Sequence, residues 1–143
     1  MRIAHRVTLF LLVLAFAFSP SAHSTGNNPR DLAATPQAKA YGALLKAVDA
    51  EDFEAYKKCM TKAAAKGIDQ QMKDTKMDSK KAMGFLKAMS PKDLKFTSLN
   101  VEGKKATLEA TGKIGDELNK GTIALEEEDG QWKVANQSWT NAK

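Results

Sequence analysis

The chain has 143 residues, of which 43% are hydrophobic and 27% are charged, and its formal net charge at pH 7 is +5. This length suits one domain with a single hydrophobic core, and the single cysteine excludes an internal disulfide. The positive charge is mild and comes almost entirely from lysine. This argues against a nucleic-acid-binding protein, which would use arginine, interleaved aromatic side chains and a larger net charge.

Residues 1–24 have the pattern of a secretory signal peptide. A short basic head precedes an apolar run at 7–18, and Ala22 and Ser24 are the small residues that signal peptidase requires before the cleaved bond. The apolar run has 12 residues, whereas a helix that spans the hydrocarbon needs about 20. We therefore expect cleavage after Ser24 and a periplasmic or secreted protein without a stable membrane anchor.

Cleavage after Ser24 would remove both histidines of the chain, His5 and His23. It would also remove two of the 22 basic residues and none of the 17 acidic ones, which leaves a net charge of about +3. A chain without histidine has no Ser-His-Asp triad, no Cys-His pair and no histidine metal site. The composition therefore predicts no metal, no cofactor and no catalytic constellation.

The first helix is expected to follow a flexible leader. Residues 25–35 are rich in Gly, Asn and Pro and lack periodicity, so we place a single domain at 36–143. Thr35 and Pro36 are typical of a helix start, and an apolar stripe at i, i+3, i+4 and i+7 predicts a helix that ends near Ala50. The stripe consists of Tyr41, Leu44, Leu45 and Val48.

A second helix should begin after Asp52, which is a suitable cap, and should end at Lys66 and Gly67. Its apolar face includes Tyr56, and Cys59 lies in the same pattern. We expect Cys59 to be a buried or half-buried free thiol, with an intermolecular bridge as the alternative.

Residues 69–89 predict a third helix or two shorter ones. Five of the six methionines lie between residues 60 and 89, where they either fill an irregular core or form an adaptable surface for a ligand or partner. Residues 57–105 hold 13 lysines and five acids. A solvated helical face explains this excess, and contact with anionic lipid or polysaccharide is the alternative.

After residues 90–93 the hydrophobic period changes from 3.6 to 2, which is typical of strands. Four alternating segments are separated by turn signals at 102–104, 114–116 and 129–130. The chain is therefore predicted to be an α+β protein, with three N-terminal helices packed on a curved four-stranded antiparallel sheet. Alternation places Leu99, Val101, Ala106, Leu108, Ile123, Leu125, Trp132 and Val134 on the inward face. Phe96 and Trp139 fall on the other face.

Three segments carry a family resemblance: AKAYGALLKAVDAEDFEAYKKCMT, MSPKDLKFTSLNVEGKKATLEATGK and GTIALEEEDGQWKVANQSW. They resemble the nuclear transport factor two-like superfamily, in particular its small exported bacterial members of unknown function, which are called lumazine-binding-like. The resemblance rests on the turn at 47–53, the hairpin at 101–108 and the ending at 129–134. It implies a cone-shaped, cystatin-like fold, often with a pocket at the open end and often dimeric through the outer sheet face.

Enzymes among the relatives, such as those similar to ketosteroid isomerases and polyketide cyclases, use a carboxylate base and acid donors inside this pocket. No acid falls on the predicted inward positions here. Asp93 and Glu109 are the nearest, and Glu109 should point outward. Asp93 is therefore the first candidate if the protein is a pocket enzyme.

The expected function is non-enzymatic binding of a small ligand or of another envelope protein, with a homodimer as a further possibility. The candidate binding residues are aromatic: Trp139, Trp132, Tyr41 and Tyr56. An exposed Trp139 would anchor a partner or a second subunit, or else would cover the edge of a helix. The alternatives are a pocket enzyme and a secreted factor that contacts an anionic membrane or polymer.

Overall fold

A computed structural model describes residues 29–143, so the predicted signal peptide and residues 25–28 lie outside the described part of the chain. The elements in chain order are α1 (Pro29–Leu32), α2 (Pro36–Asp49), α3 (Phe53–Lys58), α4 (Lys62–Thr75), α5 (Ser79–Ala88), β1 (Lys92–Glu102), β2 (Lys105–Ile114), β3 (Glu117–Glu128) and β4 (Gln131–Asn141). Within residues 29–143 no helix has the length and apolar character needed to cross a membrane.

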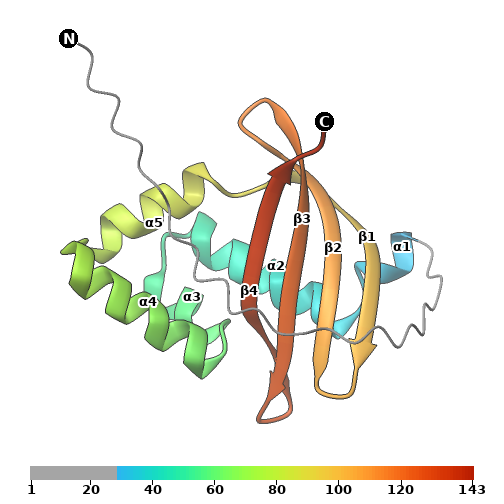
Figure 1. Cartoon of the computed structure of the whole chain (residues 1–143), viewed down its shortest axis with the longest axis horizontal. Helices are drawn as coiled ribbons and strands as arrows, with labels where there is room; N and C mark the ends of the chain where they lie inside the picture. Colours follow the sequence, from blue (N-terminus) through green and yellow to red (C-terminus); the bar gives the residue numbers. More distant parts are fainter. Residues whose placement is uncertain (1–28) are drawn as a thin grey trace.

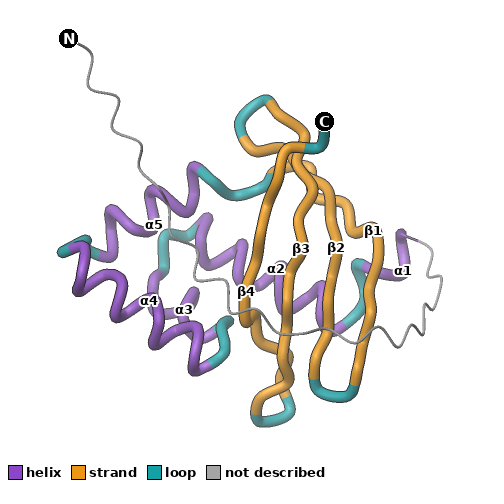
Figure 2. The backbone as a smooth tube through the Cα atoms, in the orientation of Figure 1, coloured by secondary structure: helices purple, strands orange, loops and turns teal. Residues whose placement is uncertain are grey.

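The four strands form one open antiparallel sheet in the order β1-β2-β3-β4. This strand order confirms the predicted meander. All helices of the described chain precede the sheet in sequence, and this separation of helices and strands confirms the predicted α+β class (Figure 1). Helix α2 crosses one face of the sheet, α1 lies near β1, and α3, α4 and α5 gather beyond β4 (Figure 2). The helices therefore cover the sheet unevenly, and α4 and α5 project furthest from it.

The core lies between α2 and the sheet. The predicted stripe on α2 is largely confirmed, because Tyr41, Leu44 and Val48 are each at most 2% exposed. They pack against Leu108, Ile123, Leu125 and Val134 of the sheet, which are buried to the same degree. Thr35 begins the helix as predicted, since its hydroxyl accepts a hydrogen bond from the backbone N–H of Ala38 at 3.3 Å.

The second predicted helix is divided in two, and Gly67 lies inside α4 rather than after a helix end. The backbone N–H of Thr61 donates to the carbonyl of Val134 at 3.0 Å, and the N–H of Val134 donates to the carbonyl of Cys59 at 2.9 Å. These bonds pair residues 59–61 with the edge of β4. Without them, the backbone N–H and C=O groups of Val134 at this edge would lack these partners. Pairing with β4 therefore interrupts the helix.

The third predicted segment also differs from a single helix. Its first part belongs to α4, and its second part is α5, so the described chain has five helices instead of three. Lys76 has a left-handed backbone at the end of α4, with φ 52°. Asp78 then begins α5, because its Oδ1 accepts a hydrogen bond from the N–H of Lys81 at 2.8 Å.

Two β-bulges change which side chains face the core. In β1, Phe96 pairs with Ala110 and Ser98 with Glu109, so one extra residue separates the two pairs. In β4, Val134 pairs with Leu125 but Asn136 with Ala124, which makes Ala135 the extra residue. Each bulge shifts the alternation by one position. Phe96 and Trp139 therefore lie on the inward face, and the predicted exposed position of Trp139 is wrong.

Two further predictions need correction at the edges of the domain. Val101 pairs with inward-facing Ala106 as expected, but it remains 43% exposed because no helix covers this end of edge strand β1. In the segment predicted to be a leader, residues 29–32 form α1 and Leu32 is buried. The packed part of the chain thus begins before residue 36.

Candidate functional site

Two of the predicted binding residues, Tyr41 and Trp139, meet at a third side chain, Gln137. The Gln137 side-chain oxygen Oε1 accepts a hydrogen bond from the Tyr41 hydroxyl at 2.7 Å and another from the Trp139 Nε1–H at 3.3 Å. Tyr41 is fully buried and Trp139 is half-buried against the core. This arrangement joins α2 to β4 and ties the buried Tyr41 to the last strand.

The other two predicted residues also belong to the packing of the domain. Tyr56 on α3 is buried, and Trp132 at the start of β4 is half-buried against the core. Burial is the main cause that raises the pKa of Tyr41 and that of Tyr56 above the ordinary value of 10.0. Both hydroxyls are therefore neutral at physiological pH, and the four aromatic residues do not form an open site.

Asp93, the first candidate for a pocket acid, lies on the surface. Its carboxylate forms an exposed ion pair with Lys113 at 3.4 Å, at the start of β1. Glu109 is also exposed and accepts a hydrogen bond from the Ser98 hydroxyl at 2.7 Å. Neither carboxylate lies in an apolar pocket of the kind that a catalytic acid or base would occupy.

A hollow of about 270 Å³ lies between α3, the start of α4 and the β3–β4 turn. It is rich in lysine, but the ammonium groups of Lys57, Lys62 and Lys133 have partners. Lys62 contacts Asp129 at 3.0 Å, and its backbone N–H donates to Glu128 at 3.1 Å, while Lys133 donates to the Lys58 carbonyl. An anion bound here would have to displace these partners.

Cys59 adjoins this region and is a half-buried free thiol, as predicted. Burial raises its pKa, and the charge of Lys133 opposes that shift only in part. A thiol with a raised pKa is protonated at neutral pH and is therefore a weak nucleophile. Cys59 is consistent with packing rather than with chemistry.

A larger and more open hollow, of about 510 Å³, follows the second half of α4 and its connection to α5. Two methionines, Met72 and Met77, supply its apolar surface, and Lys73 and Lys76 line it together with Asp69 and Asp78. Lys80 and Lys81 follow in the first turn of α5. We refer to Met72, Lys73, Lys76, Met77, Lys80 and Lys81, with Phe85 on the next turn of α5, as the α4–α5 tip.

Large apolar side chains are unusually exposed at the α4–α5 tip. Met77 is 41% exposed and Phe85 is 52% exposed, and Met89 just beyond α5 is similarly open. Phe85 was not singled out in the sequence, although it lies two residues after buried Met83. Two residues correspond to about 200° around a helix, so Phe85 must face away when Met83 faces the core.

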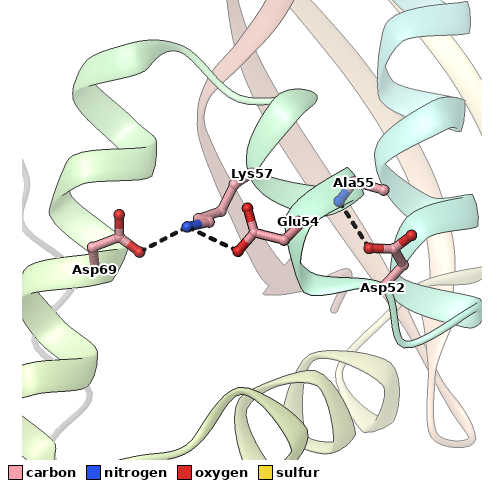
Figure 3. A network of polar contacts seen from close by, with 5 residues as sticks. All are labelled: Asp52, Glu54, Ala55, Lys57 and Asp69. Carbon is pink, nitrogen blue, oxygen red and sulfur yellow. Dashed lines mark hydrogen bonds and ion pairs between the residues drawn. The ribbon is translucent and has the colours of Figure 1, made fainter.

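The middle of α4 is attached to the domain by charged side chains (Figure 3). Lys57 on α3 contacts Glu54 and Asp69, each at 3.2 Å, and its ammonium lies 5.1 Å from the centre of the Phe53 ring. No residue of α4 is fully buried. Residues 70–75 at the end of the helix form no ion pair with another element among residues 29–143, and the tip therefore extends into solvent.

No protein-family model matches the chain, and no curated protein sequence matches it. Within the described residues, no group of three or more His, Cys, Asp or Glu side chains is placed to hold a metal ion. The geometry of the site is therefore the basis for a functional proposal.

Proposed function

We propose that the chain is an exported, non-enzymatic interaction domain of the cell envelope, periplasmic or secreted, with the cone-shaped fold of the nuclear transport factor two-like superfamily. The α4–α5 tip is its docking surface. One contrast carries this proposal: the space between α2 and the sheet is filled by side chains, whereas a hollow of about 510 Å³ opens at the tip and has Met72 and Met77 in its lining.

This contrast disfavours binding of a small ligand in the interior. A small ligand could reach the face of the sheet under α2 only if Tyr41 were displaced and its hydrogen bond to Gln137 were lost. A pocket enzyme is disfavoured for the same reason, since Asp93 lies outside this space. Exposed apolar side chains on neighbouring segments, such as Met77 between α4 and α5 and Phe85 on α5, are in contrast typical of a contact surface.

The docking surface is tested by Met77→Ser combined with Phe85→Ser. The matched control is Val101→Ser with Leu118→Ser, because these two side chains are also exposed and apolar but lie on the sheet. The measurement is the fraction of exported protein retained on isolated cell envelopes. The tip variant should lose most of this retention, and the control should keep it. Equal retention of all three proteins would contradict the proposed surface.

Export is tested separately by the mass of the protein recovered from the export compartment. Cleavage after Ser24 should give a chain that begins at Thr25. Protein found only in the cytoplasm, with residues 1–24 intact, would contradict export without bearing on the docking surface.

A further inference from the structure

We propose that the α4–α5 tip docks on the anionic phospholipid surface of a membrane, with its apolar side chains among the acyl chains and its lysines among the phosphates. This inference rests on the proposed function and specifies the partner of the same surface. In this proposal the domain attaches to one face of the bilayer, and none of the helices in residues 29–143 could span it.

Charge is the first reason. Residues 62–89 carry seven lysines and three aspartates. Lys73, Lys76 and Lys80 form no ion pair within residues 29–143. Two aspartates lie nearby: Asp74 accepts a hydrogen bond from Gln70 at 2.8 Å, and Asp78 begins α5. The four lysines of the tip outnumber these two aspartates, so the tip presents an excess of positive charge.

The charge of the sheet would orient the molecule on such a surface. Residues 106–143, which include β3 and β4, hold four lysines and seven acids. An anionic membrane would attract the tip and repel this half of the domain. Because the tip is also the part of the described chain that projects furthest from the sheet, it can reach a flat surface without a clash from the strands (Figure 1).

The apolar side chains provide the second reason. Met77 and Phe85 are 41% and 52% exposed, and the hollow that Met77 lines is open to solvent. A protein partner would need a complementary pocket for each of them, whereas the boundary between headgroups and acyl chains accepts protruding apolar groups of any arrangement. Lysine stems can follow apolar surface while their ammonium groups remain among phosphates. The combination fits a deformable anionic interface better than a rigid partner.

The test is sedimentation of the exported protein with vesicles of phosphatidylglycerol and phosphatidylcholine, compared with vesicles of phosphatidylcholine alone. The wild-type protein should bind the anionic vesicles much more tightly, and added salt should weaken this binding. The triple variant Lys73→Gln, Lys76→Gln, Lys80→Gln should lower the partition constant roughly tenfold or more, because each lysine near an anionic surface contributes measurably. Phe85→Ser should also lower it.

The control removes the same charge from the sheet half of the domain, through Lys95→Gln, Lys104→Gln and Lys120→Gln. All three side chains are exposed, and this variant should bind nearly as well as the wild type. All proteins share one N-terminus, so an uncleaved segment would affect them equally. Equal binding to both kinds of vesicle, or equal weakening by the two triple variants, would overturn the proposal.

The two proposals can fail separately. If envelope retention depends on Met77 and Phe85 while anionic vesicles are not bound, then the partner is not lipid but the docking surface stands. If neither retention nor vesicle binding depends on the tip, both proposals are wrong.

Discussion

Trp139 packs directly on Gly121 across the pairing of β3 and β4. The two residues are register partners, and a Cβ atom at position 121 would lie 2.6 Å from three carbons of the indole ring. The ring can occupy this place only because residue 121 has no side chain. An isolated glycine within a strand is a known sign of such a close approach, and here it allows a tryptophan on the last strand to cover the core.

Gly121→Ala is expected to destabilise the domain by about 1–3 kcal/mol, since the indole must move or the strands must separate. The free energy of unfolding in urea measures this effect. Gly67→Ala is the control, because Gly67 lies within α4 and no heavy atom would be within 4 Å of its added Cβ. That substitution should stabilise by roughly 0.5–1 kcal/mol. Similar effects at the two positions would show that the ring does not depend on Gly121.

Gln137→Leu is expected to cost about 1–3 kcal/mol, because it leaves the buried Tyr41 hydroxyl without its acceptor. Tyr41→Phe removes the hydroxyl itself and should lower the free energy of unfolding by a smaller amount. The double variant should be more stable than the sum of the two losses predicts, since no unpaired hydroxyl remains. Urea unfolding of the wild type, the two single variants and the double variant gives the coupling free energy between the two side chains. Strictly additive losses would mean that the bond between Tyr41 and Gln137 contributes nothing.

The protein is expected to lose stability at alkaline pH because both of its tyrosines, Tyr41 and Tyr56, are buried. Burial raises the pKa of each above the ordinary value of 10.0, so above that pH the unfolded chain releases protons that the folded chain retains. Their contribution to stability is thus complete below pH 10 and declines as the pH rises toward the folded values. Tyrosinate absorbance and circular dichroism should change together. Ionisation without loss of structure would contradict this.

Lys57→Gln is expected to loosen α4 without unfolding the domain. The side chain joins α3 to α4 through Asp69, whose carboxylate is half-exposed, so the change in global stability should be small. Amide hydrogen exchange in α4 around Asp69 should nevertheless become faster. Lys62→Gln is the control, because its pair with Asp129 is 80% exposed on both sides and should have a smaller effect. Unchanged exchange in Lys57→Gln would refute the role of this side chain.

The local signals of the sequence were sufficient for most of the fold. Thr35 begins α2, and the turns at 102–104, 114–116 and 129–130 separate the four strands as expected. These features depend on neighbouring residues, such as a capping oxygen or a glycine with positive φ at Gly130. The α+β class and the antiparallel order could therefore be predicted without tertiary contacts.

The candidate site could not be predicted in the same way. The aromatic residues attracted attention, yet Tyr41 and Tyr56 are packing residues, and the proposed surface instead includes Phe85 and Met77. Whether a side chain on a helix is exposed depends on which other segment of the chain packs against that face of the helix. The composition contains the lysine excess at 57–105, but it does not show that α4 and α5 project from the sheet and bring the lysines of the α4–α5 tip to one end of the molecule.

By itself the sequence determined the class of the fold, the helix stripe at Tyr41, Leu44 and Val48, and the turns between the strands. The tertiary structure decided the facing of Phe96 and Trp139 and the break at residues 59–61. A β-bulge inserts one residue where the pairing of two distant strands requires it, and the break forms because the edge of β4 supplies backbone partners. Both events depend on segments far apart in the chain, so local periodicity cannot reveal them.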